Sequence, residues 1–322
     1  MLADILKNKK CFKLVCGAGN EDLSEVEKLV YVYSKAGCNL FDLSANIDVI
    51  RAAKSGLKKA GISENRYLCV SVGIKGDPHI NKAVIIETLC KKCNACTKIC
   101  PQNAIYSNNT HFNTVNRSKC IGCGRCKTAC KFNAINFESM EIDLKKVLPP
   151  IIGEGIDCLE FHAITDDDTL VYEKWNTLTE SYNGILSICI DRSKLSNKRL
   201  IERLVKMIAV RKPYSTIIQA DGAPMSGGED SYKSTLQAVA TAEVVQNAGI
   251  PVHILLSGGT NSKSSELASL CDIDISGVAI GTYARQIVKE YISSEKFWED
   301  SDLQNNAISE ALNLVNSILK WL

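Results

Sequence analysis

The strongest constraint in this sequence is one cysteine spacing that occurs twice within a short stretch. The first run is Cys90-x2-Cys93-x2-Cys96-x3-Cys100, and the second is Cys120-x2-Cys123-x2-Cys126-x3-Cys130. In such a run the first three thiolates can reach three corners of a cubane, whereas the fourth lies too far along the chain and binds the neighbouring cluster. We therefore predict two [4Fe–4S] clusters, one bound by Cys90, Cys93, Cys96 and Cys130 and the other by Cys120, Cys123, Cys126 and Cys100.

Two zinc knuckles are the alternative, because Cys-x-x-Cys pairs also suit tetrahedral zinc. Zinc needs no third Cys-x-x-Cys step, and both runs continue into the same Asn-Ala-Ile tail, which ends at Ile105 and at Ile135. The segment closely resembles the repeat of bacterial ferredoxins. Lys131 stands where the first run has Pro101, and we expect this replacement to loosen the second turn without removing a ligand.

The chain has fifteen cysteines, and in a large chain without an export signal they indicate thiols or metal ligands and not disulfides. We expect those outside the two runs to be buried as small hydrophobic side chains. They are Cys11, Cys16, Cys38, Cys69, Cys158, Cys189 and Cys271.

The cysteine segment contains no acidic residue between Thr88 and Phe137, although it has many basic ones. Two interpretations stay open: the basic groups compensate the negative charge of thiolate-ligated clusters, or they form a docking face for an acidic redox partner or an anionic ligand such as a quinone. The basic residues are Lys91, Lys92, Lys98, Arg117, Lys119, Arg125, Lys127 and Lys131.

Outside this segment, apolar strand-like runs alternate with amphipathic helices, which is typical of a parallel α/β fold. We predict an α/β fold of the (β/α)8 TIM-like class with an inserted ferredoxin-like module: residues 1–86 and 139–322 form the barrel, with a C-terminal helix, and residues 87–138 form the module. A doubly wound open sheet is the alternative. The predicted strands are 12–17, 39–43, 67–72, 156–161, 184–190, 215–220, 251–257 and 277–281.

Two helix faces can also be predicted. Ser24-x-x-Glu27 reads as a capping box for a helix that buries Val26, Leu29, Val30 and Tyr33. After the fifth strand, the same spacing predicts a buried face of Ile201, Leu204, Val205 and Ile208.

Glycine-containing loops follow the last two predicted strands, where barrel enzymes bind phosphate with backbone amides. This position favours the barrel over the open sheet and predicts a site for flavin mononucleotide (FMN) or another anionic ligand. Tight turn geometry alone is the alternative. The residues predicted to bind the ligand are Gly258, Gly259, Thr260, Gly281 and Thr282.

Other strand ends place polar groups that would line the same mouth, although the sequence assigns no catalytic residue among them. For His162 we favour a hydrogen-bonded, structural role. The loop 221–230 is either a lid or an inert surface loop. The polar residues are Asp42, Glu160, His162, Asp191, Arg192 and Asp221.

Overall charge and hydropathy narrow the functional class. The formal net charge is +2, from 38 basic and 36 acidic residues, so the chain as a whole indicates neither nucleic acid nor an anionic membrane as a partner. No apolar run approaches the ~20 residues that a membrane helix requires, and Met1 to Asp4 do not begin a signal peptide. We expect a cytoplasmic protein.

Several blocks together resemble the family of cyanobacterial light-dependent period proteins (LdpA), which are iron–sulfur proteins of the circadian input pathway. Besides the cysteine runs, the resemblance rests on 14–22 (LVCGAGNED), 219–227 (QADGAPMSG), 257–261 (SGGTN) and 281–285 (GTYAR). It implies a redox-sensing protein that reports light to the clock, with clock input proteins such as a sensor histidine kinase as partners.

A second class of function stays open beside this one. Barrels with phosphate loops after strands seven and eight, supplied by ferredoxin clusters, resemble flavin-dependent dihydroorotate and dihydropyrimidine dehydrogenases. Such an enzyme needs a catalytic base and a lysine that contacts the flavin, and the sequence offers no convincing candidate for either. We therefore favour a redox sensor over an enzyme.

Overall fold

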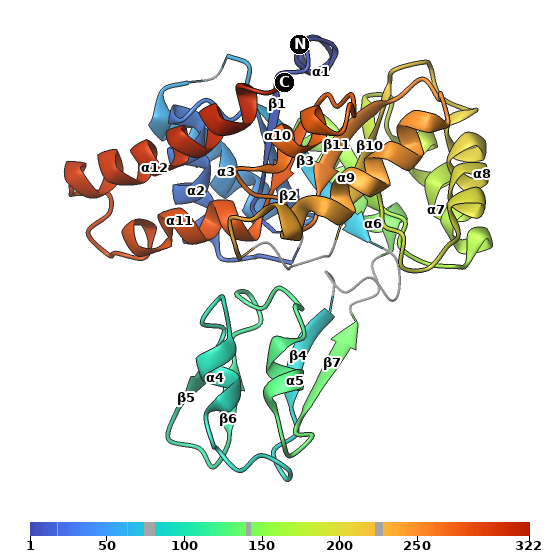
Figure 1. Cartoon of the computed structure of the whole chain (residues 1–322). Helices are drawn as coiled ribbons and strands as arrows, with labels where there is room; N and C mark the ends of the chain where they lie inside the picture. The colour runs from blue at the N-terminus through green and yellow to red at the C-terminus, as the bar shows by residue number, and fades with distance from the viewer. Residues whose placement is uncertain (18, 63, 74–80, 140–142, 223–227) are drawn as a thin grey trace.

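The computed structural model describes residues 1–17, 19–62, 64–73, 81–139, 143–222 and 228–322. In these residues, eight parallel strands close into a barrel (Figure 1). Because β1 pairs with both β2 and β12, the open sheet is excluded and the predicted barrel is confirmed. In spatial order the strands are β1 (Cys11–Val15), β12 (Gly277–Ile280), β11 (His253–Ser257), β10 (Thr216–Asp221), β9 (Ile185–Ile190), β8 (Cys158–His162), β3 (Tyr67–Gly73) and β2 (Leu40–Ser44).

Helices surround the barrel and cover its outer apolar face. Helix α1 (Leu2–Lys7) lies at the end where the strands begin, and α12 (Ser301–Leu319) packs against α2 and α11. No helix in the described ranges is long and apolar enough to span a membrane. The surrounding helices are α2 (Leu23–Lys35), α3 (Ile47–Ala60), α6 (Leu144–Gly153), α7 (Asp168–Ser181), α8 (Asn197–Ile208), α9 (Tyr232–Asn247), α10 (Ser264–Leu270) and α11 (Thr282–Ile292).

Two local predictions about these helices are wrong. The N-cap of α2 is Asp22, whose carboxylate accepts a hydrogen bond from the Glu25 amide at 3.2 Å, so Ser24 lies inside the helix. The predicted inner face of α8 is rotated, because Val205 is 47% exposed. Helix α8 instead buries a charged residue, Arg203, which hydropathy periodicity assigns to solvent.

The cysteine segment forms a separate module below the barrel, inserted between β3 and α6 (Figure 1). Its outer strands pair antiparallel, β4 (Asn81–Ile85) with β7 (Ile135–Ser139), so the module includes residues before the expected boundary at 87. Between them lie α4 (Ala95–Ile99), the antiparallel pair β5 (Ile105–Ser107) and β6 (Asn113–Val115), and α5 (Arg125–Ala129).

The two halves of the module fold alike. Asn103 and Asn133 both adopt left-handed backbone angles, with φ of 50° and 51°. The amides of Ala104 and Ala134 donate to the sulfur atoms of Cys100 and Cys130, at 3.2 and 3.4 Å. The second turn therefore keeps the geometry of the first, and the expected loosening at the Lys131 replacement is not found.

The barrel interior is layered because alternate residues of each strand point inward. At the end where the strands begin, α1 covers an apolar layer that includes Cys11, Leu40 and Cys158. Two residues further along the same strands, Lys13, Asp42 and Glu160 are all buried. The interior of a TIM barrel is usually filled by branched apolar side chains, so this polar middle layer is unusual. It lies below the C-terminal ends of the strands, where barrel proteins carry their sites.

Candidate functional site

The eight cysteines of the two runs line two separate cavities, four in each. Each cavity combines the first three cysteines of one run with the last cysteine of the other. The same two groups of four cysteines are predicted from the spacing. We call the cavity with Cys90, Cys93, Cys96 and Cys130 the outer cavity, and the one with Cys120, Cys123, Cys126 and Cys100 the inner cavity.

The two cavities differ in exposure and in their neighbours. In the outer cavity Cys93 is exposed, and Lys91 and Phe132 stand on its wall. In the inner cavity Cys120 and Cys126 are buried. The outer cysteine group is therefore the more exposed of the two, because it has one buried cysteine, Cys96, whereas the inner group has two.

Contacts between the inner half of the module and the barrel explain the lower exposure of the inner cysteines. The buried ammonium group of Lys82 donates to the carbonyl oxygens of Gly19, in the loop after β1, and of Cys120, the latter at 2.9 Å. Lys289 of α11 donates to the carbonyl oxygen of Pro101 at 2.5 Å. Lys82 of β4 thus connects the barrel loop at Gly19 to Cys120, and Lys289 connects α11 to the residue after Cys100.

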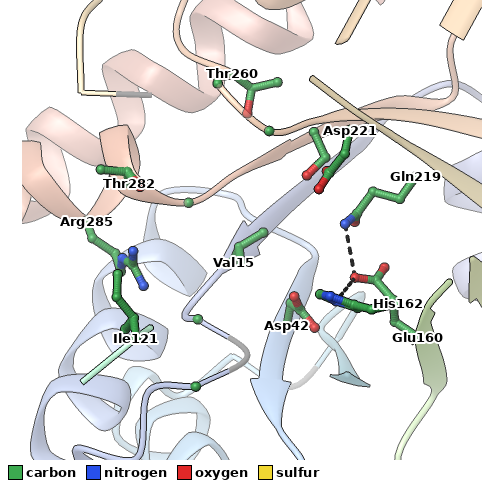
Figure 2. A pocket seen from close by; sticks show the side chains of 16 residues that line it. Val15, Asp42, Ile121, Glu160, His162, Gln219, Asp221, Thr260, Thr282 and Arg285 are labelled. Carbon is green, nitrogen blue, oxygen red and sulfur yellow. Dashed lines mark hydrogen bonds and ion pairs between the residues drawn. The ribbon is translucent and has the colours of Figure 1, made fainter. Parts of the chain in front are cut away.

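A pocket opens at the barrel mouth, with about 700 Å³ between its walls, part of it open to solvent. Ile121, which directly follows Cys120, forms part of its wall, so the inner cysteine loop borders the pocket (Figure 2). The pocket also brings together all five residues predicted for the anion site: Gly258, Gly259, Thr260, Gly281 and Thr282.

Below this pocket, Glu160 is the centre of a hydrogen-bond network. Its carboxylate accepts from Lys13 Nζ at 2.5 Å, from Ser187 Oγ at 2.7 Å and from Gln219 Nε2 at 3.0 Å. Lys13 also donates to Gln219 Oε1 at 2.7 Å and lies 3.8 Å from the carboxylate of Asp42. All of these side chains are buried, so one ammonium group stands between two carboxylates in the barrel interior.

This arrangement separates the pKa values of the two carboxyl groups. Burial raises the pKa of Asp42 to about 6, against the opposing charge of Lys13. Burial also opposes ionisation of Glu160, but Lys13 and the hydrogen bonds outweigh it and hold the pKa of Glu160 below its ordinary value. We infer an ionised Glu160 paired with a protonated Lys13, and an Asp42 that titrates near neutrality.

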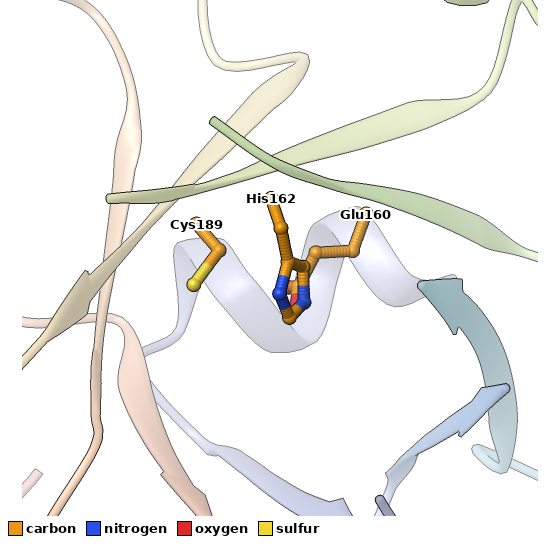
Figure 3. Close-up of side chains that lie close together, drawn as sticks. All are labelled: Glu160, His162 and Cys189. Atoms are coloured by element: carbon orange, nitrogen blue, oxygen red, sulfur yellow. The ribbon is translucent and has the colours of Figure 1, made fainter. Parts of the chain in front are cut away.

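His162, Cys189 and Glu160 also lie close together, with ligand atoms within 4.8 Å of one another (Figure 3). His162 Nε2 is 3.3 Å from Glu160 Oε1. Because the Glu160 oxygens already accept several hydrogen bonds, we interpret this group as part of the network and not as a metal site.

The remaining expectations have mixed outcomes. Asp42, Glu160, His162 and Asp221 line the mouth pocket. Asp191 and Arg192 border a different surface cleft beside α8 and do not line that pocket. Cys271 is exposed at the end of α10, so the expectation that it is buried is wrong, whereas the other six cysteines outside the runs are buried. Residues 223–227 of the expected lid loop lie outside the described residues.

Sequence reasoning missed two residues that matter most here. Lys13 lies within a predicted apolar strand, and the prediction gave it no role. Residues two apart on a strand point to the same face, so a lysine two residues after the inward-facing Cys11 is the signal for a buried charge. Ile121 was passed over as a spacer between two cysteines. Its contact with the barrel mouth depends on how the module docks, which spacing does not encode.

Comparisons with known proteins match both parts of the chain. Residues 80–141 match the LdpA Fe-S cluster-binding domain, and residues 151–319 match the Light dependent period A C-terminal domain. The chain is 29% identical to Light dependent period A of Synechococcus elongatus over 295 residues, which cover 87% of this chain and 82% of that one. It is also 35% identical to the arsenate respiratory reductase iron-sulfur subunit ArrB of Shewanella over 81 residues, 24% of this chain and 33% of that one.

Among solved structures, the barrel fold is shared with a candidate fructose-1,6-biphosphate aldolase from Coccidioides immitis. The TM-score is 0.52 at 10% identity, over 100% of this chain and 97% of that one, so the likeness concerns the fold alone. The C-terminal match alone spans more than half of the 322 residues, and it lies beside a matching cluster-binding domain. The chain therefore belongs to the light dependent period A family of iron–sulfur proteins.

Proposed function

We propose that this protein binds two [4Fe–4S] clusters and uses them to sense redox state in the light-dependent timing of the circadian clock. The observation that carries the proposal is the division of eight cysteines between two cavities, with one cysteine exchanged between the runs. When bound, such clusters supply reversible one-electron exchange.

The residues around the cysteines fit thiolate-bound clusters. Several amides donate to the cysteine sulfur atoms, including that of Ala83 to Cys120 at 3.4 Å, and Asn113 Nδ2 donates to Cys96 at 3.4 Å. Hydrogen bonds to thiolate sulfur stabilise the more negative, reduced state and raise the potential of a cluster. The same donors would lower the charge of bound thiolates inside the module.

The difference between the cavities supports a direction for electron exchange. The exposed Cys93 makes the outer cavity the entry point for a redox partner, for which the basic groups nearby favour an acidic protein. The inner cysteine group lies against the barrel. A change in oxidation state there would alter the charge next to the barrel, which clock input proteins such as a sensor histidine kinase would read.

Iron counting with paired substitutions tests the cluster assignment. Protein purified without oxygen should contain about eight iron and eight sulfide per chain. Cys130→Ala combined with Cys93→Ala should retain about four iron, because both cysteines belong to the outer group. Cys130→Ala combined with Cys123→Ala should lose almost all iron, because it breaks both groups. Cys271→Ala, at an exposed cysteine outside the module, is the control.

Loss of almost all iron from the Cys130→Ala, Cys93→Ala variant, with about four iron left in the Cys130→Ala, Cys123→Ala variant, would mean that each run binds its own cluster. Zinc in place of iron would rule out the redox function. The role in timing requires a test in cells. A Synechococcus elongatus strain lacking its own light dependent period A should recover the dependence of circadian period on light intensity when given this chain, but not when given the Cys130→Ala, Cys123→Ala variant. Equal rescue by both would refute cluster-based sensing.

A further inference from the structure

We propose that the barrel-mouth pocket binds a small organic phosphate, with its phosphate at the end formed by Arg285 and the α11 N-terminus. This site is defined by barrel residues, so binding itself does not depend on the clusters. The site is related to the proposed function only because it lies next to the inner cysteine loop, whose Ile121 forms part of the pocket wall.

Arg285 is the first observation that indicates an anion. Its side chain is 8% exposed and lines the pocket (Figure 2). One guanidinium nitrogen, Nη1, donates to the carbonyl oxygen of Cys16 at 2.8 Å, but Nε has no hydrogen-bond partner and the group forms no ion pair with a carboxylate within the described ranges. Glu25 acts on this guanidinium electrostatically but forms no ion pair with it. A buried donor such as Nε without an acceptor is costly, and an anionic ligand would supply the acceptor.

Arg203 shows what a purely structural buried arginine looks like in this molecule. It is 2% exposed, and its guanidinium pairs with the carboxylate of Asp168 at 2.5 Å. It also donates to the carbonyl oxygens of Ala163 and Thr165, at 3.1 and 2.7 Å. Arg285 lacks such a carboxylate partner among the described residues, although it is buried to a similar degree and faces a pocket.

Backbone amides provide the second observation. Helix α11 begins at the pocket with Gly281 as its N-cap, which provides no side-chain capping bond, so the first amides of the helix face no side-chain acceptor there. Gly258 and Gly259, on the neighbouring loop, have φ of 64° and 82°. Amides at a helix N-terminus and in such a loop are suited to phosphate.

The glycines are not equally informative. A Cβ on Gly258 would lie 2.8 Å from the Gly222 amide, so packing alone requires glycine there. A Cβ on Gly281 would make only ordinary contacts with Val15, at 3.4 Å from its Cβ and 3.8 Å from its carbonyl oxygen. Glycine at 281 is therefore not demanded by packing, and its missing side chain keeps the pocket clear beside the α11 amides.

The other walls of the pocket indicate the rest of the ligand. Ile121, beside Arg285, and Val15 offer apolar contacts, and Asp42, His162 and Asp221 provide polar groups on the side away from Arg285 (Figure 2). A fitting ligand has a phosphate, an apolar or planar middle part, and N–H or O–H donors at its far end.

Calorimetric titration of the whole protein tests the site with FMN, riboflavin and inorganic phosphate as probes. FMN and riboflavin differ in the phosphate alone. We expect FMN to bind at least tenfold more tightly than riboflavin, and inorganic phosphate to compete with FMN. Phosphate binding without flavin binding would retain the anion site and indicate a smaller phosphate ester.

Thr282→Glu is the variant of choice, because an acidic residue in the first turn stabilises a helix while it repels an anion at the same amides. It should lower FMN affinity at least tenfold and remove phosphate competition. Ser301→Glu, which makes the same change at the start of α12, should bind like the parent. Gly259→Val is less suitable, because its left-handed backbone would strain any side chain.

Absence of binding by both FMN and phosphate, equal binding of FMN and riboflavin, or unchanged binding by Thr282→Glu would each overturn the site. Iron counts on the same samples separate this failure from failure of the cluster proposal. A variant that loses the ligand and keeps its iron identifies the pocket as the part affected.

Discussion

The barrel and the module are stabilised by different means. The barrel encloses a large, continuous apolar core between its strands and helices. The module's core is small, and cysteines form much of it: Cys96, Cys120 and Cys126 pack with Ala83, Ala104, Ile105 and Ile135. The side chains proposed to bind metal are thus also the side chains that fill the centre of the module.

This difference implies different responses to metal loss. A domain of this size seldom folds on a small apolar core alone, so we expect metal binding to supply much of its folding free energy. The barrel closes through its own strand pairing, and β3 and β8 pair directly across the insertion point. A cluster-dependent module on a metal-independent barrel can therefore report cluster state without losing the whole protein.

Iron removal is the most severe test of this comparison. Chelation under reducing conditions should abolish amide exchange protection in β4 and β7, because the module's apolar core is too small to hold them. Barrel strands should keep their protection, and a sample carried through the same steps without chelator is the control. Protection retained in β4 and β7 after complete iron loss would show that the module folds without metal.

A second test asks whether the charged layer makes the barrel vulnerable as well. Lys13→Met removes the ammonium group between Glu160 and Asp42 and leaves buried carboxylates unpaired, so it should lower the free energy of unfolding by about 3 to 5 kcal/mol. Urea denaturation measures the loss. Lys10→Met, at an exposed lysine of the same region, should have little effect.

Adding Glu160→Gln to Lys13→Met should recover part of the loss, because it removes one uncompensated charge. A loss below about 1 kcal/mol for Lys13→Met would mean that the charged layer contributes little beyond packing. The stability of the barrel would then come mainly from its apolar core.

The two regions also differ in how far sequence predicts them. The division of the module's cysteines between two cavities agrees with the prediction from spacing, because cysteines two residues apart must lie close together and the fourth of each run lies too far along the chain to join them. The barrel's strands follow from hydropathy alternation. The docking of Ile121 on the mouth and the pairing of Lys13 with Glu160 join residues far apart in sequence, and a single sequence carries no record of such contacts. The N-cap of α2 is Asp22 and not the predicted Ser24. Asp and Ser are about equally good N-caps, so the sequence alone does not decide between them.

A smaller effect should come from Asp42 alone, whose carboxyl pKa is raised from 3.8 to about 6 by burial. The folded state therefore binds more protons than the unfolded state between about pH 4 and pH 6, and this group's contribution to stability declines as pH rises through that window. In Asp42→Asn the decline disappears. Relative to the parent, the variant should gain about 2 to 3 kcal/mol between pH 4 and pH 7, since one pKa unit corresponds to about 1.4 kcal/mol.

Urea denaturation over this pH range measures the gain. Asp272→Asn, at an exposed aspartate, is the control and should follow the parent at each pH. If Asp42→Asn tracks the parent as well, Asp42 does not titrate in this window. The polar layer would then hold both carboxylates ionised.

The smallest expected effect concerns the basic surface of the module. Its lysines are not equivalent: Lys92 Nζ donates to the carbonyl oxygens of Asn108 and Thr110 at 2.6 and 2.7 Å, so it supports a loop. Lys91 and Lys131 are exposed and flank the outer cavity, beside Phe132, which is 43% exposed. A test of partner docking should therefore change Lys91 and Lys131 and leave Lys92 in place.

Lys91→Glu with Lys131→Glu should slow reduction by an acidic ferredoxin severalfold at low salt, because exposed charges steer the encounter of a charged partner. The difference should shrink as salt rises, since screening acts over ~8 to 10 Å at physiological ionic strength. Lys194→Glu with Lys212→Glu makes the same net charge change on the barrel and should slow reduction far less. Reduction by a zwitterionic viologen, which has no net charge, should be alike in all three proteins. Equal slowing by both pairs would assign the effect to net charge, and the module's basic groups would then serve only to balance the charge of its clusters.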